Sequence, residues 1–158
     1  MSQGYAIADE PRPGALAHIA VNPIWPLFAM MFAGTWLSWP WFVVNGFIVG
    51  CPARRKTLAV VVIGLVGLIV LAMALGIPAS LGLLPRWSLL YLHLLFVAWK
   101  LGISYFLYMQ QASTIELYQY YGGPLRNGIL VVVAGYFIWD RVAASLLETS
   151  PVLYVLMS

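Results

Sequence analysis

The sequence predicts an all-α integral membrane protein, with four transmembrane helices in a compact bundle. Of the 158 residues, 63% are hydrophobic and only 8% are charged, whereas soluble domains carry about 25% charged residues. The apolar residues also fall into runs close to the length of about 20 residues that a helix needs to cross a bilayer. We therefore expect the whole chain, residues 1–158, to form one membrane domain.

The four expected spans cover approximately residues 24–50, 57–84, 87–111 and 125–147. Pro85 and Arg86 make a tight connection between the second and third spans, and a polar, aromatic connector at 113–123 precedes the fourth. Residues 1–22 are expected to form a polar outer tail. The apolar tail at 151–158 is too short to span and is expected to lie along the interface or on a partner.

The first expected span has two interpretations, because Pro40 lies halfway along it. Proline removes a helix hydrogen bond and usually kinks the helix, so we expect one long helix kinked at Pro40. The alternative is a re-entrant pair of half-helices. That arrangement requires protein or water to cover the free backbone groups.

Basic residues orient the chain. Arg54, Arg55 and Lys56 directly follow the first span, and loops rich in lysine and arginine stay in the cytoplasm. With four spans, both termini then lie outside. With a re-entrant first segment, the N-terminus lies inside instead. The expected location is the cell membrane, as a multi-pass protein of a bacterial inner membrane.

Lys100 lies in an otherwise apolar stretch from Trp87 to Met109. A charge at that depth costs about 2.5–3.5 kcal/mol on insertion scales unless it is compensated. His93 lies two turns earlier on the same helix face. If the third and fourth spans run side by side, Asp140 reaches a similar depth, so we expect a Lys100–Asp140 pair with His93 nearby. That cluster serves as an assembly element or, alternatively, as an ion or proton pathway.

Small and polar residues inside the spans predict where helices approach each other. Gly46 and Gly50 are four residues apart, as are Ala98 and Gly102, and such pairs are common at helix–helix contacts in membranes. Asn45 is expected to make a hydrogen bond between helices. We therefore expect self-association or docking on a larger membrane protein, in addition to contact with the lipid bilayer.

Tyr120, Tyr121 and Arg126 belong to the most distinctive surface segment of the sequence. One interpretation is an aromatic turn at the membrane interface, with Arg126 at the lipid headgroups. The functional alternative is a cytoplasmic docking patch.

Several classes of function are disfavoured. The sequence has no phosphate-binding loop, HExxH or GxSxG motif, and its single cysteine, Cys51, excludes cysteine-based metal clusters. His18 is the only histidine besides His93, so no haem or other cofactor is predicted, although lipid contacts are. The net charge of +3 is too small and dispersed to indicate nucleic acid.

These observations favour a small non-catalytic membrane protein that acts as a homo-oligomer or as an accessory subunit of a larger complex. An oligomeric channel or ion-coupled transport component is the first alternative. An intramembrane enzyme is the second, because Ser104 lies one helical turn after Lys100 and forms a serine–lysine arrangement.

Overall fold

The computed structural model describes residues 14–82, 85, 88–149 and 157–158, and its regular elements in this part of the chain are helices. They are η1 (Ala17–Ile19), α1 (Ile24–Phe32), α2 (Thr35–Val49), α3 (Arg54–Ser80), α4 (Ser88–Tyr120) and α5 (Ile129–Thr149). Three helical segments are long and apolar enough to cross a membrane: Arg54–Pro78, Tyr91–Tyr120 and Ile129–Leu146. The all-helical class is confirmed. Four such helices were expected, and the described residues contain three.

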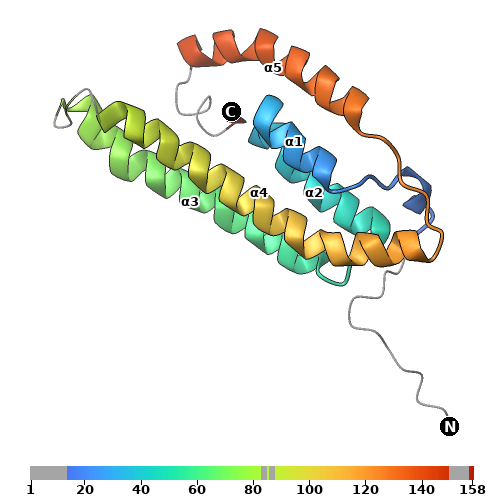
Figure 1. Ribbon diagram of the computed structural model, residues 1–158. Coiled ribbons are helices and arrows are strands. Elements are labelled where there is room, and N and C mark those ends of the chain that lie inside the picture. The colour runs from blue at the N-terminus through green and yellow to red at the C-terminus, as the bar shows by residue number, and fades with distance from the viewer. Residues whose placement is uncertain (1–13, 83–84, 86–87, 150–156) are drawn as a thin grey trace.

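The first apolar segment forms two short helices, α1 and α2, which fold back on each other as a hairpin (Figure 1). The chain reverses at Gly34, whose φ of 91° is readily adopted only by glycine. Near this tip, the Ser38 hydroxyl donates to the Pro26 carbonyl at 2.7 Å. At the other end, the Asn45 side chain accepts from the N–H of Val21 at 3.0 Å and donates to its carbonyl at 2.9 Å. The beginning of α1 and the last turns of α2 therefore lie at the same end of the molecule.

The single helix expected over residues 24–50 is replaced by α1 and α2, and Pro40 lies inside α2. The break occurs at Gly34 instead. The N–H of Gly34 donates to the Ala29 carbonyl at 3.0 Å and closes the last turn of α1. Pro40 is exposed on the outside of α2, so its ring does not force a neighbouring helix aside.

The long helices α3 and α4 run antiparallel and side by side, and α4 extends beyond the beginning of α3 (Figure 1). The Trp99 indole N–H of α4 donates to the carbonyl of Gly64 in α3 at 3.1 Å and fixes their register. Helix α4 continues through Tyr120, across most of the segment expected to be a polar connector. No proline or glycine interrupts that segment until Gly122, whose φ is 83°, so the helix has no earlier reason to stop.

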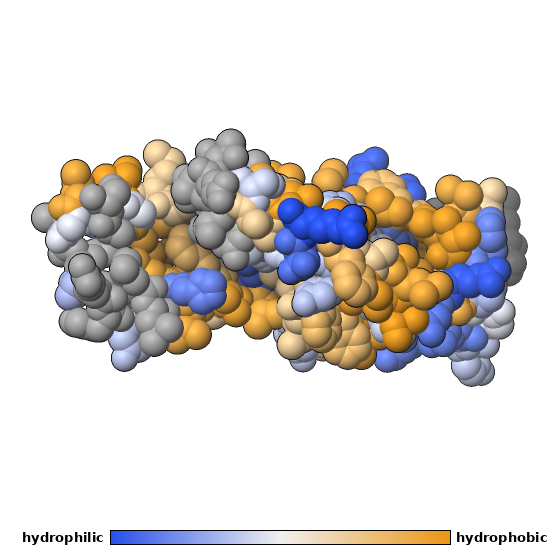
Figure 2. Space-filling model, turned by 90° about the horizontal axis from the view of Figure 1, so that it is seen from above, coloured by the Kyte–Doolittle hydropathy of each residue, from blue (hydrophilic) through white to orange (hydrophobic). Residues whose placement is uncertain are grey.

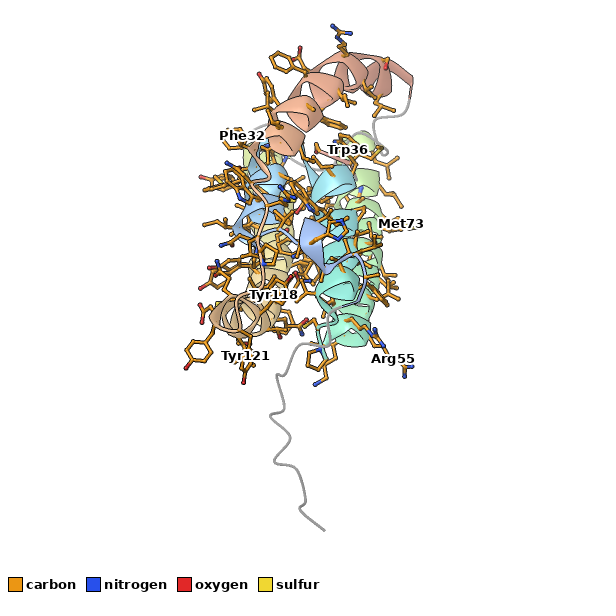
Figure 3. The ribbon with its side chains drawn as sticks, turned by 90° about the vertical axis from the view of Figure 1, so that its right-hand side faces the viewer. Phe32, Trp36, Arg55, Met73, Tyr118 and Tyr121 are labelled. Carbon is orange, nitrogen blue, oxygen red and sulfur yellow. The ribbon has the colours of Figure 1, made fainter. Side chains whose placement is uncertain are left out.

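The hairpin forms the middle layer of the molecule, between α5 on one side and the α3–α4 pair on the other (Figure 1 and Figure 3). Helix α5 packs on the hairpin through close contacts of Gly135 with Ala33 and Leu37. It therefore does not lie directly along α4, as the sequence-based depth estimate assumed.

Two clusters of buried side chains hold the hairpin against α3 and α4. The larger cluster joins α2, α3 and α4 and contains Trp39, Phe42, Val61, Leu68 and Leu107. The smaller one lies at the base of the hairpin and contains Ala17, Ala20, Val49, Ile115 and Tyr118. The hairpin is therefore packed into the protein and is not a loose surface segment.

The outer faces of the long helices are apolar and exposed. Val70 on α3 is 59% exposed, and Leu130 on α5 is 79% exposed. The surface seen from the α5 side is mostly hydrophobic, with small hydrophilic patches (Figure 2). Exposed apolar area of this extent marks contact with a membrane or another protein.

Candidate functional site

A line of buried polar side chains follows one face of α4. They are Lys100, Ser104, Gln111, Thr114 and Tyr118, and the apolar Leu107 completes the spacing. Alternating steps of four and three residues keep a set of side chains on one side of a helix. This side, which we call the polar seam, faces the α1–α2 hairpin.

Hydrogen bonds connect the polar seam to α2 at two levels. The Trp39 indole N–H donates to the Ser104 hydroxyl at 2.9 Å. Further down, the Gln111 amide donates to the Phe42 carbonyl at 2.7 Å, and its oxygen lies 3.5 Å from the amide nitrogen of Asn45. Polar groups buried in an apolar environment need such partners. The seam therefore supplies the protein cover that a re-entrant hairpin requires.

The base of the hairpin is attached in the same way. The Tyr118 hydroxyl donates to the Ala17 carbonyl at 3.0 Å. The Cys51 thiol and the Thr114 hydroxyl are 3.4 Å apart, and Cys51 is buried. Both ends of the hairpin are thus bound to the last turns of α4.

Above the tip of the hairpin lies a cavity of about 360 Å³. We call it the tip pocket. The hairpin contributes Met30, Met31, Phe32 and Gly34, α4 contributes His93 and Lys100 among apolar neighbours, and α5 contributes Trp139. Phe32 marks the tip in Figure 3, at the opposite end of the molecule from Arg55 and Tyr121. The tip pocket is therefore mostly apolar, with a few polar groups that converge on it.

Lys100 is the most deeply buried polar group of this pocket, with 3% of its surface exposed. Its ammonium group donates to the hydroxyl of Ser158 at 3.0 Å. His93 lines the same pocket, but its ring is otherwise exposed. The structure therefore brings His93 and Lys100 into one cavity and adds Ser158, which the sequence reasoning missed.

Asp140 is not part of this arrangement. It is exposed on α5, and the tip pocket includes its neighbour Trp139 but not Asp140 itself. The expected Lys100–Asp140 contact is replaced by the Lys100–Ser158 hydrogen bond. The reason is the hairpin, which occupies the space between α4 and α5 that a simple four-helix bundle would leave for the ion pair.

The end of the described chain contacts the hairpin tip directly. The main-chain oxygens of Met157 and Ser158 lie so close to Gly34 that an added side chain there would overlap them. Met157 also lines a groove of about 520 Å³ between α2 and α3, together with Trp36 and Pro40. Residues 157–158 therefore straddle the tip, with Ser158 at the tip pocket and Met157 in the groove.

The residues expected at helix contacts lie in different environments. Gly46 is buried, and an added Cβ would meet the Gln111 side chain at 3.0 Å. Gly50 ends α2 with a φ of 69°. Ala98 and Gly102 are exposed on α4, and no described atom lies within 4 Å of a Cβ built at Gly102. This second pair faces away from the hairpin.

The expected topology signal and docking turn lie at the base of the molecule. Arg54, Arg55 and Lys56 are exposed in the first turn of α3. Tyr120 and Tyr121 are 84% and 63% exposed. Arg126 is tied to the segment before α1, because its backbone N–H donates to the Ala20 carbonyl at 2.7 Å.

The polar seam was missed although the sequence contains a signal for it. Gln111 and Thr114 continue the series that starts at Lys100 and Ser104, at intervals that fit one helix face. Each residue alone is unremarkable for a membrane helix. Only their common spacing over five helical turns indicates a polar face.

The chemistry available at the tip pocket is binding by positive charge and hydrogen-bond donors. Among the described residues, no group of three or more histidine, cysteine, aspartate or glutamate side chains is placed to hold a metal ion. Ser104 accepts the Trp39 indole proton one turn below the pocket and is not part of its lining. Lys100 and His93 are the described lining residues whose side chains are ionisable.

Fold and site together define a small, all-helical protein with three helices suited to crossing a membrane and a helical hairpin packed among them. No family model, curated protein or solved structure matches the chain.

Proposed function

We propose that the protein is a non-catalytic membrane protein that binds an anionic group in the tip pocket. The observation that carries this proposal is Lys100, which is 3% exposed and lines a cavity of about 360 Å³ together with His93 and Trp139. Ligand pockets typically measure about 300–1,000 Å³ and combine an apolar lining with a few polar groups. An ionisable residue inside a membrane helix is commonly part of a substrate or ion pathway.

The length of the hairpin supports a re-entrant position in the membrane. Helix α2 has 15 residues and is therefore about 22 Å long, whereas the hydrocarbon core is about 30 Å thick. The hairpin enters from the side of Arg54, Arg55 and Lys56, which the positive-inside rule assigns to the cytoplasm. In this arrangement the segment before α1 is also cytoplasmic. The tip pocket then lies within the membrane and approaches the opposite face.

A buried cation favours an anion over a neutral ligand, because charges interact more strongly in an apolar surrounding than in water. The group that fits is a carboxylate or a phosphate, which offers several oxygens to the Lys100 ammonium group. Such a group comes either from a free anion or from an amphipathic molecule in the bilayer. Both sources share the chemistry that Lys100 recognises.

Binding to the protein in nanodiscs of zwitterionic lipid tests the proposal. The probes are radiolabelled inorganic phosphate, for the free source, and dansyl-labelled undecanoate, for the membrane source. We expect at least one probe to bind and Lys100→Met to weaken its binding at least tenfold. Lys56→Met is the matched control and should bind the probe like the unmodified chain, because Lys56 is exposed in the first turn of α3, at the base of the molecule and away from the tip pocket. Binding of neither probe, or equal binding by both variants, would overturn the proposal.

Self-assembly is a second candidate role, in keeping with the expectation of a homo-oligomer or accessory subunit. The specific observation is that Ala98 and Gly102 face outward on α4, where a small-residue pair admits a close helix of a second copy. Gly102→Leu should then lower the oligomeric state measured by mass photometry in detergent. An unchanged mass would dismiss this contact.

A further inference from the structure

Residues 157–158 combine the two chemical features of an amphipathic molecule. Ser158 offers its hydroxyl oxygen to Lys100 at 3.0 Å, and the main-chain oxygens of residues 157 and 158 lie against Gly34. The side chain of Met157 is an unbranched apolar arm, and it lines the groove between α2 and α3. Oxygens therefore occupy the tip, and an apolar chain occupies the groove beside it.

The tip is built to attract oxygen atoms. Helix α2 begins at Thr35, directly after Gly34, and the first N–H groups of a helix have no partner within the helix. The same helix end carries a partial positive charge. The buried ammonium group of Lys100 adds a full charge from α4. The oxygens of residues 157 and 158 thus lie where two independent features favour them.

The groove lies on the other side of residues 157–158 from the tip pocket, because Met157 lines the groove and Ser158 lines the pocket. It measures about 520 Å³ and is lined almost entirely by apolar atoms, from Trp39 and Val43 on α2 and from Leu58 and Leu65 on α3. On α2 its lining residues run from Thr35 to Val44, so the groove extends along that helix and suits a chain.

We propose that the ligand of the tip pocket is a single-chain amphiphile with an anionic oxygen headgroup, and that residues 157–158 occupy its place when it is absent. The proposal rests on the proposed function, since it uses the same lysine. In the bound state the headgroup receives the Lys100 ammonium hydrogen bond, and the chain lies in the α2–α3 groove. Ligand and chain end then compete for Gly34 and Lys100.

Competition has a measurable consequence. Suppose that the ligand binds only to molecules in which residues 157–158 have moved away from the tip. Its apparent association constant is then the intrinsic association constant multiplied by the fraction of molecules with an open tip. Removing one contact of the chain end raises that fraction. Because a single hydrogen bond contributes about 0.5–1.5 kcal/mol, removing the Ser158 hydroxyl should tighten binding of the amphiphile by about twofold to twelvefold.

The experiment compares Ser158→Ala and Met157→Ser with controls of the same type. Ser113→Ala removes an exposed hydroxyl of α4, and Met73→Ser removes a methionine that points away from the hairpin on the outer side of α3 (Figure 3). The probes are dansyl-labelled undecanoate and a lysophosphatidate, each titrated into the full chain in zwitterionic nanodiscs. Methyl-labelled methionine NMR follows Met157 directly. We expect the two chain-end variants to bind more tightly, the controls to be unchanged, and the Met157 signal of the unmodified chain to shift at saturation.

The outcomes separate this inference from the proposed function. Lys100-dependent binding of an amphiphile, with unchanged affinity in both chain-end variants and a stationary Met157 signal, overturns the competition alone. Lys100-dependent binding of inorganic phosphate without binding of either amphiphile overturns the single-chain ligand and leaves the anion site in place. Absence of any Lys100-dependent binding overturns both proposals. If only one amphiphile binds, the preferred headgroup is identified.

Discussion

Single polar side chains determine how the hairpin fits against α4. In hydrocarbon, an unsatisfied polar group costs several kcal/mol, so a buried donor of the hairpin is stabilised by an acceptor on α4 or on the hairpin itself. Trp39 and Ser104 meet at 2.9 Å, and Ser38 meets the Pro26 carbonyl at 2.7 Å. These contacts select one register between helices whose apolar surfaces alone would tolerate several.

The Trp39–Ser104 hydrogen bond can be measured by a double-mutant cycle. Trp39→Phe and Ser104→Ala should each lower the free energy of unfolding in mixed micelles. Their coupling energy should be about 0.6–1.7 kcal/mol, the range found for hydrogen bonds between membrane helices. Tyr105→Phe, at an exposed position on α4, is the control and should show no coupling with Trp39→Phe. Strictly additive effects of Trp39→Phe and Ser104→Ala would contradict this contact.

Gly34 is the second residue on which the hairpin depends. Its φ of 91° and ψ of −173° lie in a region that is open essentially only to glycine, where a side chain is strained by about 1–3 kcal/mol, and Gly34→Ala would also overlap residues 157–158. We expect this variant to lose at least that much unfolding free energy. Gly102→Ala is the matched control, because its helical position is open and alanine there should stabilise α4 by about 0.5–1 kcal/mol. Equal effects of the two variants would refute the tight turn at Gly34.

At the scale of elements, the hairpin is closed at its base by Asn45. This one side chain satisfies both the N–H and the carbonyl of Val21 and also approaches Gln111. Asn45→Ala leaves two backbone groups without partners, so we expect a loss of about 1–3 kcal/mol. Hydrogen exchange at the Val21 amide should become faster in Asn45→Ala than in the unmodified chain, and an unchanged exchange rate would count against this clamp.

The sequence predicted the long elements better than the short ones. Hydropathy is a sum over consecutive residues. The apolar stretches of α3, α4 and α5 are therefore recognisable without knowing which helices pack against them. Whether residues 24–50 cross the membrane or turn back within it depends on contacts with distant residues. Pro40 is the more conspicuous signal for a break, but the break lies at Gly34, which has a positive φ and a close contact with residues 157–158.

In the candidate site, too, local features could be predicted from the sequence, whereas contacts between distant residues could not. Lys100 and His93 could be assigned to one pocket because their seven-residue separation places them on one helix face. The partner of Lys100 could not be predicted, since Ser158 reaches it only through the fold. Asp140 was a reasonable candidate by depth, but depth alone does not reveal that a hairpin lies between α4 and α5.

At the scale of the whole molecule, the account depends on an odd number of crossings. In the proposed arrangement, three long helices and a hairpin that returns to its starting side put residues 14–22, Arg54–Lys56 and Tyr121 on one side of the membrane. The end of α3 is then on the other side. If residues 24–50 formed one kinked span instead, the segment before α1 would be on the same side of the membrane as the end of α3. The tip pocket exists only in the first arrangement, because a continuous first span has no tip.

Cysteine accessibility measures this difference most directly. In a Cys51→Ser background, single cysteines are placed by Gly14→Cys, Leu81→Cys and Tyr121→Cys, all at exposed positions, and labelled with a membrane-impermeant thiol reagent in intact cells and after permeabilisation. We predict that the cysteines at 14 and 121 react only after permeabilisation, while the cysteine at 81 reacts in intact cells. Labelling of position 14 together with position 81, on the side opposite to 121, would contradict the re-entrant hairpin and the pocket at its tip.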